Sequence, residues 1–347
     1  MPEPPSPLAI TASLDLDGLI VVAGAGGFIG GHLVSALQQR GHRRIRAVDS
    51  KPIGQWHQRP GGVEYVQADL RPADACYRVT DGAACVFDLA ADMGGMGFIE
   101  YHRADCMLSA LIGAHLLMAA RDHQVKRFFF ASSACVYNID KQREAGVTAL
   151  KEEDAYPAMP EDGYGWEKLF TERLCRHFSD EYGLPTRVAR FHNVYGPLGT
   201  WDGGREKAPA AICRKVAEAK ISGGAEIEIW GDGEQTRSFM YIDDCVEGTL
   251  RILFSDYSDP LNLGSDELVT INQMVDIVER IAGINLRRVY NLSAPKGVRG
   301  RNSDNSRIRE VLGWEPSRTL EDGLERTYAW IYDELASGRR DPSLNVA

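Results

Sequence analysis

The sequence predicts an α/β fold, in which a doubly wound parallel sheet is accompanied by a smaller C-terminal lobe. Short apolar runs recur through the first half of the chain, and such runs are typical of buried parallel strands. They occupy residues 19–23, 45–49, 63–67, 85–89, 127–132 and 186–191. Helical stretches separate them, notably residues 27–40, 101–121 and 164–182. This alternation indicates a parallel sheet with helices on both faces.

The remaining stretches set the expected domain organisation. The Pro-rich residues 1–17 predict a disordered leader, and residues 18–190 a first domain to which 240–265 return. After residue 190 the strand–helix rhythm breaks and the chain becomes rich in Gly and charge. Residues 191–239 and 266–337 are therefore assigned to the smaller lobe, and 338–347 to a flexible tail.

Composition excludes several classes of protein. The 347 residues carry 39 Lys and Arg against 49 Asp and Glu, a net charge of −10, without a long basic run. Nucleic acid is thus a disfavoured partner, because phosphate backbones require clustered cations. No run of 18 apolar residues suggests a membrane span. The seven cysteines form no Cys-x-x-Cys pair, so neither disulfides nor a metal site are expected and a cytoplasmic location fits best.

A glycine-rich turn lies between the first strand and its helix. The segment reads Gly-Ala-Gly-Gly-Phe-Ile-Gly from position 24, and its residues Gly24, Gly27, Phe28, Ile29 and Gly30 form the candidate cofactor loop. Glycines at these positions permit a tight turn and let a pyrophosphate approach the backbone at a helix N-terminus. This arrangement predicts a Rossmann-type dinucleotide site.

Two carboxylates bear on the choice of dinucleotide. Asp49 ends the second strand 19 residues beyond Gly30, where it can accept hydrogen bonds from the adenosine ribose and would repel a 2′-phosphate. NAD is therefore favoured over NADP, although Arg44 and Lys51 argue in the other direction. Asp69 ends the third strand and could either reach the adenine or cap a helix.

A second pattern predicts oxidation and reduction of a hydroxyl group. Tyr164 and Lys168 are spaced i, i+4 and so share one helical face. A phenol has a pKa near ~10 and requires a nearby cation to act as a base at neutral pH. Ser133, at the end of the fifth strand, could bind the same substrate hydroxyl. The combination resembles the extended short-chain dehydrogenase/reductase family, whose members often modify nucleotide sugars.

Longer motifs narrow the resemblance. The segments AADMGGMGFIE (90–100), SSACVYN (132–138), RFHNVYGPLGTWDGGREKAPAAICRK (190–215), GDGEQTRSF (231–239) and GVRGRNSDN (297–305) resemble the GDP-mannose 3,5-epimerase family over residues 19–330. The resemblance implies an isomerase of carbohydrate biosynthesis that converts GDP-mannose to GDP-L-galactose and/or GDP-L-gulose. In such a reaction, transient oxidation at C4 makes the C3 and C5 protons acidic, and one group removes a proton while another returns it on the opposite face.

The resemblance also implies the residues of the site. Cys135 and Lys207 would be the acid/base pair, and Tyr164 with Ser133 and Lys168 would serve the oxidation. The implied substrate contacts are Gly94, Gly95, Met96, Ser133, Asn193, Glu206, Lys207, Lys215, Gln235, Arg237 and one or both of Arg299 and Arg301. The sequence does not choose between those two arginines for phosphate binding. Trp201 is suited equally to a pocket wall and to core packing.

Alternatives remain at this stage. A relative with the same motifs could invert only C3, only C5, or a different nucleotide sugar. A catalytically inactive NAD(H) sensor on the same fold is a further alternative, but it would be expected to lose the tyrosine or its partners. The superfamily commonly forms homodimers through helices equivalent to residues 101–121 and 164–182, so a homodimer is expected here.

Overall fold

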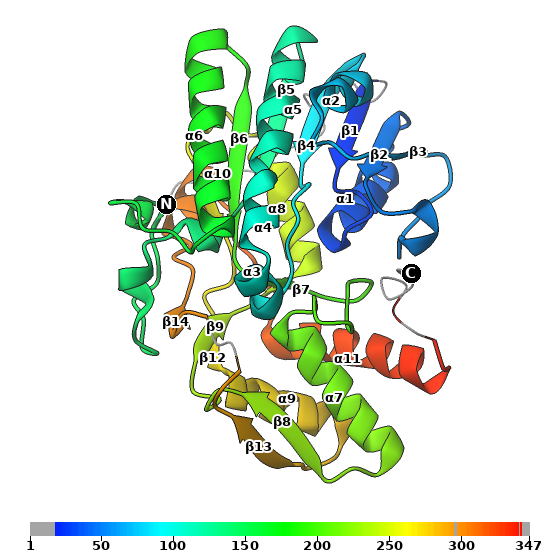
Figure 1. Ribbon diagram of the computed structural model, residues 1–347, viewed down its shortest axis with the longest axis vertical. Helices are drawn as coiled ribbons and strands as arrows, with labels where there is room; N and C mark the ends of the chain where they lie inside the picture. The colour runs from blue at the N-terminus through cyan, green and yellow to red at the C-terminus, as the bar shows by residue number, and fades with distance from the viewer. Residues whose placement is uncertain (1–17, 295–296, 340, 342–347) are drawn as a thin grey trace, which may run out of the picture.

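The computed structural model describes residues 18–294, 297–339 and 341. The predicted leader at 1–17 and most of the predicted tail at 338–347 lie outside these residues. Figure 1 shows a sheet flanked by helices in the upper part of the view and a smaller group of helices and short strands below it.

The large sheet has seven strands in the order β11-β6-β5-β4-β1-β2-β3, and all its pairings are parallel. Its strands are β1 (Leu19–Ala23), β2 (Ile45–Asp49), β3 (Glu64–Gln67), β4 (Ala83–Asp88), β5 (Arg127–Ser133), β6 (Thr186–Phe191) and β11 (Leu261–Leu263). The predicted fold class is confirmed. The predicted bounds of β1, β2 and β6 coincide with those observed, and those of β3, β4 and β5 differ by one or two residues.

The two faces of the sheet are buried by different helices. Ile20 and Val22 of β1 point into one core, which includes side chains of α1 (Phe28–Gln39) and α8 (Ile242–Phe254). Val21 and Ala23 point to the opposite core, which includes side chains of α2 (Ala73–Thr80), α5 (Ala110–Asp122) and α6 (Tyr164–Tyr182). This division follows from the alternation of side chains along a strand, and it explains why these strands are apolar throughout.

The helix predicted over residues 101–121 is observed over Arg103–Asp122, divided at Ser109 into α4 (Arg103–Leu108) and α5. A further helix, α3 (Met96–Tyr101), precedes it. His102 separates α3 from α4, because its backbone (φ −123°, ψ 41°) leaves the helical region. The helical stretch Arg103–Asp122 meets the length and composition expected of a membrane span, with a mean hydropathy of 1.3. In this fold it packs against α2 and α6, as a helix flanking a core does.

The smaller lobe follows β6 and contains three small sheets. Its strands pair as β7 (Val194–Tyr195) with β10 (Met240–Tyr241), β9 (Thr236–Ser238) with β12 (Leu268–Thr270) and β14 (Gly300–Arg301), and β8 (Glu226–Trp230) with β13 (Arg287–Asn291). Helices α7 (Ala208–Ser222), α9 (Ile271–Ala282) and α11 (Leu320–Ala336) pack together at the bottom of Figure 1. The short helix α10 (Ser306–Leu312) contacts β11.

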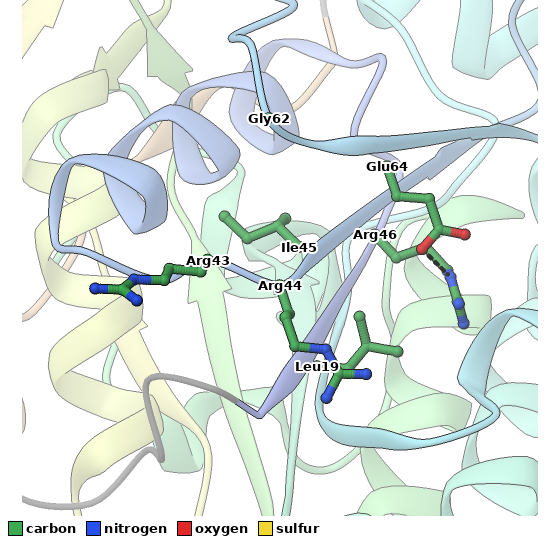
Figure 2. Close-up of a pocket in the computed structure, with 7 residues that line it drawn as sticks. All are labelled: Leu19, Arg43, Arg44, Ile45, Arg46, Gly62 and Glu64. Carbon is green, nitrogen blue, oxygen red and sulfur yellow. Dashed lines mark hydrogen bonds and ion pairs between the residues drawn. The ribbon is translucent and has the colours of Figure 1, made fainter.

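One pocket lies at the amino-terminal edge of the sheet. Figure 2 shows it lined by residues at the starts of β1, β2 and β3, which are Leu19, Arg43, Arg44, Ile45, Arg46, Gly62 and Glu64. Arg46 forms an ion pair with Glu64 at 3.0 Å. Ligands of open α/β sheets bind at the carboxyl ends of the strands. This pocket lies at the opposite edge of the sheet, so it is not the predicted cofactor and substrate site.

Candidate active site

The glycine turn has the shape that a dinucleotide requires. Gly24 has φ +82°, and a Cβ there would lie 2.7 Å from the backbone of Leu89. A Cβ on Gly30 would lie 2.2 Å from the carbonyl oxygen of Gly24. Phe28 and Ile29 begin α1, and Gly27 is its N-cap. The turn thus presents bare backbone at a helix N-terminus, so these residues fit the pyrophosphate of NAD.

Asp49 is held at the edge of this turn. Its carboxylate accepts hydrogen bonds from the backbone N–H groups of Gly26 and Lys51, both at 3.0 Å. Each carboxylate oxygen retains acceptor capacity for a ribose hydroxyl. Arg44 lies at the opposite, amino-terminal end of β2 (Figure 2). It therefore does not offset the negative charge of Asp49 in the choice between NAD and NADP, as the sequence suggested it would.

Asp69 is exposed and pairs with Arg71 at 2.7 Å. The hydrogen bond from Arg71 lowers the pKa of this carboxyl. Helix α2 takes Pro72 as its N-cap, so the capping role considered for Asp69 is not the one observed. Adenine binding by Asp69 stays a prediction.

Tyr164, Ser133 and Cys135 meet where β5 ends and α6 begins. The Ser133 Oγ accepts a hydrogen bond from the Cys135 N–H at 3.2 Å, which holds the cysteine in a short 3-10 turn. Gly165 makes the close approach possible, because a Cβ there would lie 2.3 Å from the carbonyl oxygen of Cys135. Burial raises the pKa of Tyr164, while hydrogen bonding with Ser133 acts in the opposite direction.

Lys168 lies behind Tyr164 in a buried group of charges. Its Nζ is 3.6 Å from Glu167 Oε2 and 5.5 Å from the centre of the Tyr164 ring. Asp88, at the end of β4, acts electrostatically on the same ammonium group. Burial raises the pKa of Asp88 to about 7 and also raises that of Glu167, whereas Lys168 lowers both. These contacts place a cation next to the phenol, as Tyr164 requires if it is to act as a base.

Cys135 is buried beside a guanidinium group. Arg301 Nη1 lies 3.6 Å from Cys135 Sγ, its Nη2 donates to Glu161 Oε1 at 2.6 Å and its Nε donates to Gln142 Oε1 at 2.7 Å. Burial and the nearby Glu161 carboxylate raise the pKa of the Cys135 thiol to about 11, and Arg301 opposes them. The other six cysteines are buried and free, and no disulfide is present among the described residues.

Lys207 enters the same group of residues from the smaller lobe. It is the N-cap of α7, and its side chain interacts electrostatically with Cys135 and Arg301. Burial lowers the pKa of Lys207, and the positive charge of Arg301 lowers it further. Burial and Arg301 also lower the pKa of Arg237 to about 10. This end of the site therefore carries an excess of positive charge within an acidic protein, which suits an anionic substrate.

Two predicted substrate loops lie against each other. The Gly95 N–H donates to the Arg205 carbonyl at 3.0 Å, and a Cβ on Gly95 would lie 2.6 Å from the carbonyl oxygen of Glu206. Arg205 stacks on Phe98, 3.8 Å from the ring centre. Gly94 is part of the same loop, and Met96 begins α3, but the Met96 side chain lies outside the described residues.

The other predicted substrate residues make hydrogen bonds with backbone groups of the chain. Asn193 donates to the Ser238 carbonyl at 3.0 Å and Gln235 to the Trp230 carbonyl at 2.9 Å. Lys215 donates to the Glu228 carbonyl at 2.9 Å. Glu206 accepts from the Gly204 N–H at 2.6 Å. Their contacts with substrate stay predictions.

The structure distinguishes the two arginines that the sequence left open. Arg299 is partly exposed and pairs with Asp232 at 2.8 Å. Arg301 is only 4% exposed and contacts Cys135. Trp201 is buried in the core at 2% exposure, so of its two suggested roles it has the packing one.

Several residues that shape the site were not predicted. They are Gly26, Asp88, Gln142, Glu161 and Glu167. Gly26 was within the recognised motif, and a Cβ there would lie 2.7 Å from the Trp56 indole. Glu167 directly precedes Lys168 within the Tyr164–Lys168 motif. Asp88, Gln142 and Glu161 are single polar residues without a local spacing that marks them, and only the folded chain brings them to the site.

The NAD-dependent epimerase/dehydratase family model matches residues 20–264. This is most of the chain, and it covers the glycine turn, Ser133, Cys135, Tyr164, Lys168 and Lys207. The chain belongs to the NAD-dependent epimerase/dehydratase family.

Relatives within this family agree with the geometry. The chain is 50% identical over 317 residues to a GDP-mannose 3,5-epimerase of Oryza sativa subsp. japonica, covering 91% of this chain and 82% of that relative. It is 48% identical to the GDP-mannose 3,5-epimerase of Arabidopsis thaliana over the same shares of the two chains. Among solved structures, the UDP-glucose 4-epimerase of Thermotoga maritima with UDP-glucose superposes with a TM-score of 0.82 at 27% identity, covering 91% of this chain and 99% of that one.

A UDP-glucuronic acid 4-epimerase from Bacillus cereus, solved with its substrate and NAD, gives a TM-score of 0.77 at 26% identity and covers 90% of this chain and 99% of that one. The predictions of an NAD-dependent nucleotide-sugar epimerase and of NAD as the cofactor are thereby confirmed. The alternative of an inactive NAD(H) sensor is not supported.

Proposed function

We propose that this enzyme is a GDP-mannose 3,5-epimerase, which inverts C3 and C5 of the mannosyl group to give GDP-L-galactose and/or GDP-L-gulose. The observation that carries the proposal is that Cys135, Tyr164, Lys207 and Arg301 converge from four separate segments on one buried site. The 50% identity to a plant GDP-mannose 3,5-epimerase supports the same substrate.

NAD, when bound, supplies the reversible oxidation of the C4 hydroxyl to a ketone. Tyr164 accepts the proton of that hydroxyl, with Lys168 nearby to stabilise the phenolate and Ser133 to orient the hydroxyl. The C4 ketone acidifies the protons at C3 and C5, so that removing either one gives a stabilised enolate.

The acid/base pair completes each inversion. Burial lowers the pKa of Lys207 and so favours its neutral amine, which can accept a proton. The pKa of Cys135 is raised, so its thiol is protonated and can donate. Two groups with these opposite tendencies, on opposite faces of the ring, would take the proton on one side and return it on the other. Arg237 and Arg301 contribute the positive charge that would stabilise the enolate and the diphosphate.

The proposal is tested by incubating the purified protein with NAD and GDP-mannose in heavy water and examining the recovered sugar by NMR. Deuterium at both C3 and C5, with epimeric products and without net NADH, is the expected result. Deuterium at one carbon only would replace the proposal with a single-centre epimerase. Deuterium at neither carbon would overturn it, and the same assay with UDP-glucose would then test for a different sugar nucleotide.

We also propose a homodimer formed through α4, α5 and α6. Apolar side chains on these helices are unusually exposed, with Met107, Leu108, Leu111, Trp166 and Phe170 each between 42% and 52% exposed. The three helices contact one another, and large apolar side chains exposed on neighbouring helices favour an interface. Light scattering after size exclusion should give twice the monomer mass for the wild type and a lower mass for Phe170→Glu. A monomeric wild type would contradict the dimer.

We further propose that the protein is located in a reducing compartment, the cytoplasm. The seven free, buried cysteines support this location.

A further inference from the structure

Glu161 is a buried carboxylate that belongs to the acid/base site although none of the sequence motifs includes it. It lies three residues before Tyr164, and its side chain is only 11% exposed. Its backbone N–H donates to the carbonyl oxygen of Cys135 at 3.0 Å, so the two residues are tied through the main chain as well. A buried carboxylate is costly unless it is paired, which makes its position beside a thiol informative.

The thiol and the carboxylate share one guanidinium group. Arg301 directs Nη1 to Cys135 Sγ at 3.6 Å and Nη2 to Glu161 Oε1 at 2.6 Å, while Gln142 holds its Nε. Gln142 is itself fully buried and donates to the carbonyl oxygens of Tyr137 and Asn138, both at 3.3 Å. Gln142 therefore fixes the orientation of the guanidinium group. A change in the charge of either Cys135 or Glu161 alters how strongly Arg301 acts on the other.

The remaining ionisable groups around Cys135 are mostly cations. Lys207 approaches from the start of α7, Arg237 from β9 and Arg301 from β14, and Tyr164 from α6 is a neutral phenol. Glu161 is the negative charge among these groups. Although burial opposes ionisation, Arg301 and the hydrogen bonds from Cys135 and Arg301 keep the pKa of Glu161 below its ordinary value. Without this carboxylate, the thiol would face cations alone and would lose its proton more readily.

We propose that Glu161 is a positioning residue that neutralises Arg301 and so keeps Cys135 as a protonated thiol until the substrate is bound. The inference rests on the proposed function, in which Cys135 returns a proton to the enolate. A thiol can donate that proton, whereas a thiolate formed in advance could not. The carboxylate undergoes no chemistry of its own, since it acts only on the charge that the sulfur meets, both by neutralising Arg301 and by lying beside the thiol itself.

The experiment measures the protonation of Cys135 directly. Full-length protein with NAD and without substrate is treated with iodoacetamide at a series of pH values, and alkylation of the Cys135 peptide is followed by mass spectrometry. The midpoint of alkylation for Glu161→Gln should fall by about 1 to 2 pH units relative to wild type, since the variant leaves Arg301 unneutralised. Arg301→Gln should shift the midpoint upward. Glu153→Gln, which removes an exposed carboxylate paired with Arg307, is the matched control and should not shift it.

A double variant keeps the proposal testable if the single variants fold poorly. Glu161→Gln with Arg301→Gln removes both charges together and leaves neither one buried without its partner. Its midpoint should lie between those of the single variants. An unchanged or higher midpoint in Glu161→Gln, or a shift in the same direction for both single variants, would overturn the proposal.

The same variants separate this inference from the proposed function. The alkylation midpoint does not depend on any sugar substrate. Deuterium exchange into GDP-mannose should decline at a pH about 1 to 2 units lower in Glu161→Gln than in wild type, in step with the alkylation midpoint. Exchange without a midpoint shift would overturn the role of Glu161 and leave the epimerase intact. If the alkylation midpoint shifts but neither wild type nor any variant exchanges deuterium into GDP-mannose, the role of Glu161 is supported and the proposed substrate is overturned.

Discussion

Two buried clusters of ionisable groups lie near Tyr164, and they differ in which kind of group predominates. The cofactor-side cluster consists of Lys168, Glu167 and Asp88, so carboxyl groups outnumber cations. The substrate-side cluster consists of Cys135, Arg301 and Glu161, and Lys207 and Arg237 add further positive charge to it.

The same depth of burial therefore has opposite consequences in the two clusters. On the cofactor side, burial raises the pKa values of Asp88 and Glu167 and favours their protonated forms. On the substrate side, Arg301 holds the pKa of Glu161 below its ordinary value, and burial with Arg301 lowers that of Lys207. The protonated carboxyls leave little negative charge on the cofactor side, whereas the positive excess on the substrate side suits a diphosphate and an enolate. Variants that affect one cluster and spare the other should separate cofactor binding from proton transfer.

The largest effect is expected for Cys135→Ser. A serine hydroxyl is far less acidic than a thiol, so deuterium exchange into GDP-mannose should slow by about 10²- to 10⁴-fold. NAD affinity, measured by fluorescence titration, should be unchanged because the cofactor-side cluster is intact. Cys76→Ser on α2 is the control, since Cys76 is equally buried but bonds to the Leu70 carbonyl away from the site. Exchange at the wild-type rate in Cys135→Ser would remove the sulfur from the mechanism.

Lys168→Met should weaken NAD binding and leave the protonation of Cys135 unchanged. It removes the cation that faces Asp88 and Glu167, and with it the stabilisation of the Tyr164 phenolate. Turnover should fall by roughly 10²-fold, and the dissociation constant for NAD should rise by about tenfold, equivalent to ~1.4 kcal/mol. The alkylation midpoint of Cys135 should stay the same. A shift of that midpoint would show that the two clusters are not independent.

Asp88→Asn should change how stability depends on pH. The unfolded carboxyl ionises near 3.8, whereas burial raises the folded pKa to about 7. Between these values the folded chain binds more protons than the unfolded one, so wild-type stability falls as pH rises across this window and is level above it. The free energy of unfolding of the variant should rise relative to that of wild type across the same window, by on the order of 4 kcal/mol. Thermal unfolding from pH 4 to 8 measures the gain, and parallel curves for the two proteins would contradict it.

The smallest effect is expected at the outer end of the cofactor site. Asp49→Asn keeps acceptor capacity for the Gly26 N–H but removes the negative charge that disfavours a 2′-phosphate. The preference for NAD over NADP should narrow by about tenfold, or ~1.4 kcal/mol, without a change in the alkylation of Cys135. Dissociation constants for both dinucleotides check the change, and an unaltered preference would show that Asp49 does not set it.

The two sides of the site also differ in how far the sequence predicts them. The cofactor turn, its flanking strand and helix, and the Tyr164–Lys168 pair are local patterns, and their spacing alone locates them. The substrate side is assembled from segments as distant as Cys135 and Arg301, which are 166 residues apart. Resemblance to a family suggested Cys135 and Lys207, but no local pattern marks Glu161 or Gln142, because their contacts with Arg301 are made across more than 100 residues of sequence.

Local irregularities were also beyond prediction. The helix expected over 101–121 is apolar and regular in sequence, yet it begins only after His102 and is divided at Ser109, whose Oγ accepts a hydrogen bond from the Asp92 N–H at 2.9 Å. Arg299 and Arg301 have the same side chain two residues apart, so only their surroundings distinguish an exposed partner of Asp232 from a buried partner of Cys135.

The central claim is that Cys135 and Lys207 address the two faces of one sugar ring. A crystal structure of Cys135→Ser with NAD and GDP-mannose would test it most directly. The account predicts the hexose between residue 135 and the Lys207 amino group, with each within about 3.5 Å of C3 or C5 and on opposite faces of the ring. Both groups on the same face, or the hexose out of reach of either one, would contradict it.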